Sequence, residues 1–312
     1  YRKTTDVLYT PAASVSDIFG LKLSKVNTGA LENKGWEFEL GYANHLGDFN
    51  YRINGNFSII NNKVLTLGLG NVQQRNGMVG NGSDLFIGYP MEMFYGYKTD
   101  GLFLDDSEVS SWVDQKAIAS GSKAGDIRYL DVTGDNKVTP DDRVYLGSRI
   151  PKYTFGLNLA CNYKQFDFSM LLQGVAKVKG LLNRYAGWAF NQEGNIQKWQ
   201  MEETWNVQKH NRYAKYPRLE TTSNAGGKNT LTSDYWLLDA SYLKVRNVQL
   251  GYTLPKNTAK NIGIAALRMF VSLDNPLTLD HYYKGWDPET TNSSGYYYPT
   301  MATYSFGLTL SL

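Results

Sequence analysis

The chain has 312 residues and a formal net charge of +3, and it contains no cluster of five or more basic residues, so a nucleic-acid partner is not expected. It has one cysteine, Cys161, and three scattered histidines, which exclude an internal disulfide and argue against a His/Cys catalytic or zinc site. The 14% aromatic content and 30 glycines favour a β protein with aromatic girdles over a cytoplasmic enzyme.

Apolar and polar side chains alternate along several stretches, and this pattern predicts β-strands with one apolar and one polar face. No apolar run reaches the roughly 18 residues of a transmembrane helix, whereas barrel strands are only half apolar. With a strand within 1–10, the expected strands are eight: the others lie at 34–45, 49–60, 153–163, 166–174, 242–254, 267–273 and 304–312. Residues expected to point away from the lumen include Trp36, Phe38, Phe155, Leu157, Phe168 and Met170, and Cys161 shares their parity.

Three local features qualify this pattern. The apolar parity changes within 242–254, which predicts a β-bulge near Arg246–Asn247. Pro276 is expected to end the strand at 267–273 because proline cannot donate to a ladder. A short helix is expected over 107–119, with Trp112 packed rather than binding a ligand.

Short and long connections alternate between the expected strands. The short ones are 45–49, 163–166 and 255–266, and the long ones are 61–151, 174–240 and 276–302. This alternation is typical of a membrane barrel with short periplasmic turns and large extracellular loops, and it places the C-terminus in the periplasm. The predicted fold class is therefore all-β, an antiparallel transmembrane β-barrel, in which eight strands could close a small barrel or form part of a larger wall.

One acidic loop has the spacing of an EF-hand-type calcium site. The candidate ligands for a structural Ca²⁺ are Asp131, Thr133, Asp135, Lys137 (through its carbonyl) and Asp142. Asn136 replaces the usual glycine but tolerates a left-handed conformation. The alternative is a solvated acidic turn without metal.

Aromatic residues in the 174–240 connection are candidates for substrate binding, because aromatic faces stack on sugar rings. They are Tyr185, Trp188, Trp199 and Trp205, and Trp236 lies beside them. The alternative for each is packing within the loops or contact with a partner. Glu37, Glu39 and Arg52 are expected to belong to a polar barrel interior rather than to a catalytic pair, so no enzymatic activity is predicted.

Several segments resemble the C-terminal half of SusC-like TonB-dependent receptors, and they follow the family's order over nearly the whole chain. The segments are NKGWEFEL (33–40), GYPMEMFYGYKTDGLF (88–103), GDIRYLDVTGDNKVTPDDRVYLG (125–147), PKYTFGLNLACNYKQFDFSMLLQG (151–174), DASYLKVRNVQLGYTLP (239–255) and the closing YSFGLTLSL. The family usually ends in an aromatic residue, and Leu312 departs from that pattern.

The resemblance implies that residues 1–312 are the C-terminal part of a barrel of about 22 strands, with the plug domain and TonB box not present in this chain. It implies a protein of the cell outer membrane that contacts its lipid and imports glycan or peptide cargo. A SusD-like surface lipoprotein and the TonB complex are the implied partners. An outer-membrane structural or adhesive barrel and a small-barrel enzyme remain the alternatives.

Overall fold

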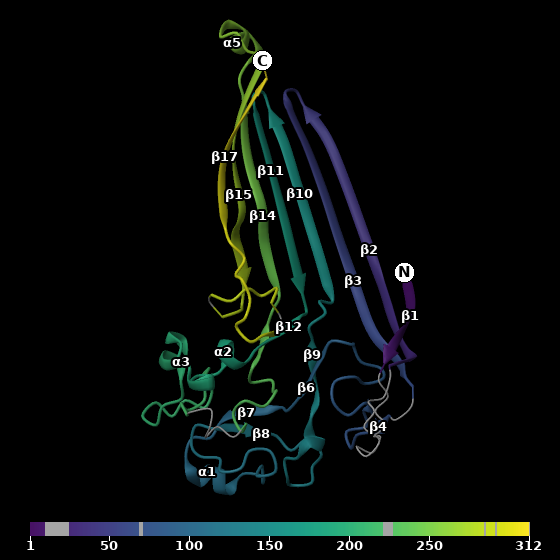
Figure 1. The fold of residues 1–312 in the computed structure, drawn as a ribbon, viewed down its shortest axis with the longest axis vertical. Helices are drawn as coiled ribbons and strands as arrows, with labels where there is room; N and C mark the ends of the chain where they lie inside the picture. The colour runs from purple at the N-terminus through teal and green to yellow at the C-terminus, as the bar shows by residue number, and fades with distance from the viewer. Residues whose placement is uncertain (10–24, 69–70, 221–226, 284, 291, 312) are drawn as a thin grey trace.

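A long antiparallel sheet of eight strands dominates the molecule (Figure 1). The computed structural model describes residues 1–9, 25–68, 71–220, 227–283, 285–290 and 292–311. Each strand of the sheet pairs with the sheet strand that follows it along the chain, as in a meander. In order, the strands are β1 (Arg2–Tyr9), β2 (Val26–Leu46), β3 (Phe49–Leu67), β10 (Tyr153–Tyr163), β11 (Phe166–Ala176), β14 (Tyr242–Thr253), β15 (Ala266–Asp280) and β17 (Thr303–Ser311).

The two faces of this sheet differ in chemistry, as the alternation predicted. Residues that pair across neighbouring strands point to the same face, so the register sorts the side chains directly. One apolar row runs through Tyr42, Ile53, Leu159, Met170, Val248, Leu273 and Tyr304. The next row, on the opposite face, runs through Ala43, Arg52, Ala160, Ser169, Gln249, Ser272 and Ser305. The shared outward face predicted for Trp36, Phe38, Phe155, Leu157, Phe168 and Met170 is confirmed by the same registers.

The apolar face is exposed on the sheet. On β2 a run of exposed apolar side chains extends from Trp36, which is 66% exposed, to Leu46, which is 69% exposed. That interval matches the roughly 9–11 residues with which a tilted strand crosses a bilayer. Leaving one such side chain in water rather than burying it forgoes about 1.5–3 kcal/mol. Several together forgo about as much as the whole stability of a typical domain, so this face requires an apolar environment.

The predicted bulge near Arg246–Asn247 is present, and it explains why the expected end of a strand at Pro276 is wrong. Val245 pairs with Leu277, and Asn247 pairs with Asp274, so Arg246 faces Asn275 and Pro276 across an irregularity in the ladder. Strand β17 reaches only as far as Asp274. The missing N–H of proline therefore costs no ladder bond, and β15 continues to Asp280.

The short connections and the C-terminus lie at one end of the sheet, and the long connections gather at the other (Figure 1). Helix α5 (Lys256–Asn261) stands among the short ones. The connection 68–152 carries β4 (Val72–Gln73), β5 (Val79–Gly80), β6 (Met93–Gly96), β7 (Thr99–Leu102), α1 (Asp106–Ser111), β8 (Ile127–Tyr129), η2 (Pro140–Asp142) and β9 (Val144–Ser148). The connections 177–241 and 281–302 carry β12 (Lys179–Leu182), α2 (Arg184–Gly187), η3 (Asn191–Glu193), α3 (Lys198–Glu203), β13 (Leu237–Asp239) and β16 (Asn292–Ser293).

The helix expected over 107–119 is shorter than predicted. It ends at Ser111, because the chain turns there to form a parallel bridge between Asp114 and Lys137. Trp112 is packed, as expected: its indole N–H donates to the carbonyl of Tyr129, and the Arg128 guanidinium lies 3.9 Å above its ring. No helix among the described residues is long and apolar enough to cross a membrane.

Candidate functional site

Two of the long connections fold together into a shared core at one end of the sheet. We call it the loop core, and it is aromatic. It consists of Tyr97, Leu102, Ala119, Ile127, Tyr129 and Val138 from 68–152, with Ala189, Trp205, Ala214, Tyr216 and Trp236 from 177–241. The two connections therefore form one folded unit rather than separate mobile loops, since burying these rings offsets the entropy of ordering such long segments.

Ion pairs join the same two connections. Arg218 donates to the carboxylate of Asp126 at 2.6 Å, and the Asn229 amide donates to the same oxygen at 2.7 Å. The Asp126 side chain is only 1% exposed. A carboxylate this deep is stable only when paired and hydrogen-bonded, so these contacts fix how 68–152 and 177–241 pack.

The loop core takes up three of the four predicted substrate-binding aromatics. Trp205 is a buried member of it, and Trp188 and Trp199 pack against it half-buried. The Trp205 indole lies so close to Gly125 that a β-carbon there would meet the ring at 2.4 Å. The structure thus brings the three tryptophans together as packing groups, and little of the Trp205 ring is left for a ligand.

Tyr185 is the exception among the four. It is 37% exposed and forms an edge-to-face pair with Tyr296, with ring centroids 5.4 Å apart. Tyr296 belongs to the third long connection and is 71% exposed. The pair therefore offers free ring faces at a point where the second and third connections meet.

The third connection is held against the polar face of the sheet by a cluster that we call the tether. Lys244 on β14 is on this face, in register with Gln173, and its ammonium group lies 2.7 Å from Asp287 and 2.9 Å from Glu289. The Lys244 side chain is 2% exposed. Glu289 also accepts a hydrogen bond from the Tyr242 hydroxyl at 2.6 Å and forms an ion pair with Arg246. Part of 281–302 is thereby folded back over the polar face instead of extending away from the sheet.

The two acids of the tether are held in their charged form. Burial alone would raise the pKa of Asp287, but hydrogen bonds from Lys244 and from the backbone N–H of Glu289 lower it below its usual value. Burial likewise opposes ionisation of Glu289, and the donors Tyr242, Lys244 and Arg246 lower its pKa. The charged tether is therefore the stable form at neutral pH.

The acidic loop 131–142 is closed by its own hydrogen bonds. Asp131 accepts from the backbone N–H groups of Gly134 at 2.6 Å and Asn136 at 2.7 Å. Asn136 adopts the left-handed conformation, with φ of 62°, as the sequence suggested. Asp142 accepts from the N–H groups of Thr133 and Thr139 and is fully buried.

These contacts bear on the calcium prediction. Burial would raise the pKa of Asp142, but the backbone N–H groups of Thr139, Thr133 and Val132 lower it, so the carboxylate is charged without a metal. The Asp135 carboxylate is paired with Arg75 at 3.3 Å. Within the described ranges, no group of three or more His, Cys, Asp or Glu side chains is placed to hold a metal ion. Calcium binding by Asp131, Thr133, Asp135, Lys137 and Asp142 stays a prediction from the sequence.

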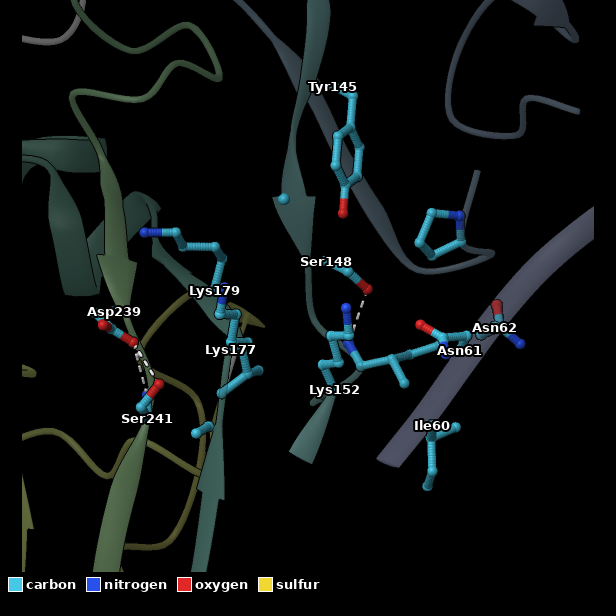
Figure 2. Close-up of a pocket in the computed structure, with 15 residues that line it drawn as sticks. Ile60, Asn61, Asn62, Tyr145, Ser148, Lys152, Lys177, Lys179, Asp239 and Ser241 are labelled. Atoms are coloured by element: carbon cyan, nitrogen blue, oxygen red, sulfur yellow. Dashed lines mark hydrogen bonds between the residues drawn. The ribbon is translucent and has the colours of Figure 1, made fainter. Parts of the chain in front are cut away.

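A pocket of about 600 Å³ lies where β3, β10 and β11 give way to the long connections (Figure 2). Asn61 and Asn62 line it from β3, and Tyr145 and Ser148 line it from β9. Its charged lining residues are Lys152, Lys177, Lys179 and Asp239.

Sequence patterns did not point to the tether or to this pocket. A lysine at position 244 has the polar parity of its strand, and a buried lysine needs an acidic partner, so the parity could have signalled a contact. The partner was hidden because Asp287 lies 43 residues further on, in an irregular segment. Glu37 and Glu39 do fall on the polar face, as predicted. Their partners across the strands are Ser58 and Asn56, neither of which is an acid or a histidine.

Comparisons with known proteins agree with this geometry. No family model matches the chain. Two TonB-dependent receptors of Formosa agariphila are 28% and 27% identical to it, over 100% and 99% of this chain and 32% and 31% of their own length. The TonB-dependent receptor SusC of Bacteroides thetaiotaomicron is 24% identical over 99% of this chain and 29% of its own length. The chain thus spans about a third of the length of the curated relatives it matches.

Solved structures give the same fold. A structure of the RagAB peptide transporter matches 100% of this chain and 32% of its own chain, with a TM-score of 0.73 and 21% identity. Its open-open state matches with a TM-score of 0.72. The eight-stranded sheet therefore has the fold of part of a β-barrel wall, and the chain is similar over its whole length to TonB-dependent receptors, SusC among them.

Proposed function

We propose that this chain forms part of the wall and the extracellular loops of an outer-membrane importer for oligosaccharides or other large nutrients. The observation that carries the proposal is the sheet with one apolar and one polar face, whose long connections all gather at one end. Its whole-length similarity to TonB-dependent receptors supports coupling to the TonB complex, which would supply the energy. The long-connection end is then extracellular, and the C-terminus is periplasmic.

The proposed mechanism needs no covalent chemistry from this chain. The polar face lines the cargo path, and the tether folds 281–302 over that face so that the path is narrowed beside β14. Tyr185 and Tyr296 present exposed rings at the same end of the sheet, and such rings stack on sugar or peptide groups. Importing cargo would then require movement of a lid and of the part of the importer that couples to the TonB complex, while the wall stays rigid.

A SusD-like lipoprotein lid is the partner we propose for the loop end. Similarity to SusC and to one chain of the RagAB transporter supports such a pairing. The connection 177–241 also carries large apolar side chains that its own core does not cover. Met201 is 58% exposed, Val207 is 64% exposed and Tyr213 is 72% exposed. Exposed apolar surface of this kind commonly marks a protein contact.

The lid contact is tested by point substitutions. A deletion within 181–199 would also disturb the loop core, because that range supplies Trp188 and Trp199 to it. The variant with Met201→Ser, Val207→Ser and Tyr213→Ser should lose most of its lipoprotein co-purification and most of its cargo uptake while the barrel still assembles. Ile262→Ser is the control, since Ile262 is 61% exposed but lies in the connection at the opposite end. Undiminished pairing and uptake in the triple variant would reject this surface as the lid contact.

A further inference from the structure

The pocket in Figure 2 carries an excess of positive charge. Lys152, Lys177 and Lys179 line it, against one carboxylate, that of Asp239. Among the described residues, none of the three ammonium groups forms an ion pair within 4.0 Å. Asp239 accepts from the Ser241 hydroxyl at 2.6 Å and from its backbone N–H at 3.0 Å. Burial opposes its ionisation, but these hydrogen bonds and the nearby charge of Lys179, its partner across the strands, lower the pKa of its carboxyl. Lys152 and Lys177 are therefore the two charges among the described pocket residues without an acidic counterpart.

The pocket reaches the apolar face of the sheet. Ala176 lines it and pairs with Tyr153, which pairs in turn with Ile59, and Ile59 is the partner of the exposed Trp36. The ammonium group of Lys152 lies 5.8 Å from the centre of the Tyr153 ring. The pocket therefore touches the edge of the apolar belt at Ala176, while Ile60 and Asn62, which have the polar-face parity of β3, line its other side.

The position of Lys179 is built into the backbone. Gly147 has a φ of 135°, in the left-handed region, and a β-carbon there would meet Cγ of Lys179 at 2.6 Å. The aliphatic stem of Lys179 thus passes directly over Gly147, and β12 fixes it opposite Asp239. The Tyr145 hydroxyl offers a further polar group beside the same space.

We propose that this pocket binds the phosphate group of a lipid in the membrane leaflet at the long-connection end of the wall. Lysine ammonium groups bind phosphate oxygens as point charges, and basic pockets at the polar margin of a membrane hold anionic headgroups. The adjoining apolar rows would carry the acyl chains of the same molecule. A pocket of about 600 Å³ accommodates a phosphorylated headgroup. The proposal rests on the proposed function only in taking the apolar face to be lipid-facing.

The test uses the protein expressed in an outer membrane and extracted in mild detergent. The variant with Lys152→Ala, Lys177→Ala and Lys179→Ala is compared with a control carrying Lys164→Ala, Lys256→Ala and Lys260→Ala, which removes the same charge at the opposite end. Lys164 makes a matched control because its ammonium group lies 5.3 Å from the centre of the Tyr163 ring. Bound phospholipid and phosphorylated glycolipid are counted by native mass spectrometry.

The expected result is at least a fivefold loss of bound phosphorylated lipid in the pocket variant and no such loss in the control. Unsubstituted protein stripped of lipid should regain it in nanodiscs of phosphatidylglycerol and regain less in nanodiscs of phosphatidylcholine alone, and the pocket variant should regain little in either. Equal lipid retention in the two variants would overturn the proposal. So would binding of inorganic phosphate without lipid, which would make this a soluble-anion site. Failure of the proposed function would appear separately, as absent cargo uptake with lipid retention unchanged.

Discussion

At the scale of single residues, the tether shows how one buried charge shapes a loop. Lys244 is nearly inaccessible to solvent, and both of its acidic partners come from 281–302. Removing one member of a buried ion pair costs about 3–5 kcal/mol, because the other charge is left without a partner. The position of this connection therefore depends on few side chains.

Lys244→Ala should release 281–302 from the polar face. Each 1.36 kcal/mol corresponds to a factor of ten in an equilibrium, so local opening should rise at least tenfold. Limited chymotrypsin digestion of the assembled protein would measure it as faster cleavage near Tyr296–Tyr298. Lys256→Ala, in the exposed part of α5, should leave the rate at the wild-type value. A Lys244→Ala protein cleaved no faster than this control would show that the tether does not hold the loop.

Acid should release the same connection. Asp287 and Glu289 have pKa values lowered in the folded protein, so their contribution is fully present above the unfolded carboxyl values of about 4. It is lost as the pH falls through the lowered folded values. The backbone amides of 281–302 should therefore be protected at pH 7 and lose protection only below about pH 4. Hydrogen exchange over a pH series would measure this. Release already between pH 5 and pH 6 would contradict this origin of the tether.

At the scale of elements, the strands could be predicted from the sequence, and the content of the long connections could not. Period-two alternation is a local signal, and it placed seven of the eight strands of the sheet and the bulge at Arg246–Asn247, while the first strand, expected within 1–10, does not rest on it. The continuation of β15 past Pro276 depends on what the neighbouring strands do there, which no local pattern reveals. The early end of α1 depends on a bridge from Asp114 to Lys137 in the same way.

The candidate site was predictable only in part, for the same reason. The sequence singled out aromatic residues in 177–241, but stacking on a ligand and packing in a core demand the same side chains. Only the fold distinguishes them: Trp205 is buried between two connections, while Tyr185 keeps an exposed ring. The tether and the basic pocket combine residues from distant segments, so no spacing pattern could assemble them.

The loop core should behave as a structural unit that is separate from the sheet. Trp205→Ala removes a ring packed over Gly125, and a buried tryptophan truncated to alanine typically costs about 3–5 kcal/mol. Hydrogen exchange should show lost protection in both 97–138 and 186–236 while β10 and β11 stay protected. Tyr185→Ala is the control and should change neither. Loss of protection confined to 186–236 would show that the two connections do not stabilise each other.

At the scale of the whole molecule, the sheet is one portion of a larger wall. Its outer strands, β1 and β17, each have one sheet neighbour among the described residues. Unpaired backbone groups cannot remain in hydrocarbon, so in a membrane both edges must meet further strands. The polar face of the wall is then its inside and the apolar face its outside, and the long and short connections mark its two ends. The importer proposal depends on which of these ends faces the medium.

Cysteine labelling of intact cells tests that central claim most directly. In a Cys161→Ser background, Ser120→Cys marks the long-connection end, outside the proposed lid contact, and Asp48→Cys marks a short turn at the other end. A membrane-impermeant maleimide should label the Ser120→Cys protein on intact cells. It should label the Asp48→Cys protein only after the outer membrane is permeabilised. Labelling of Asp48→Cys on intact cells, with Ser120→Cys protected until permeabilisation, would contradict an outer-membrane importer with its long loops outside.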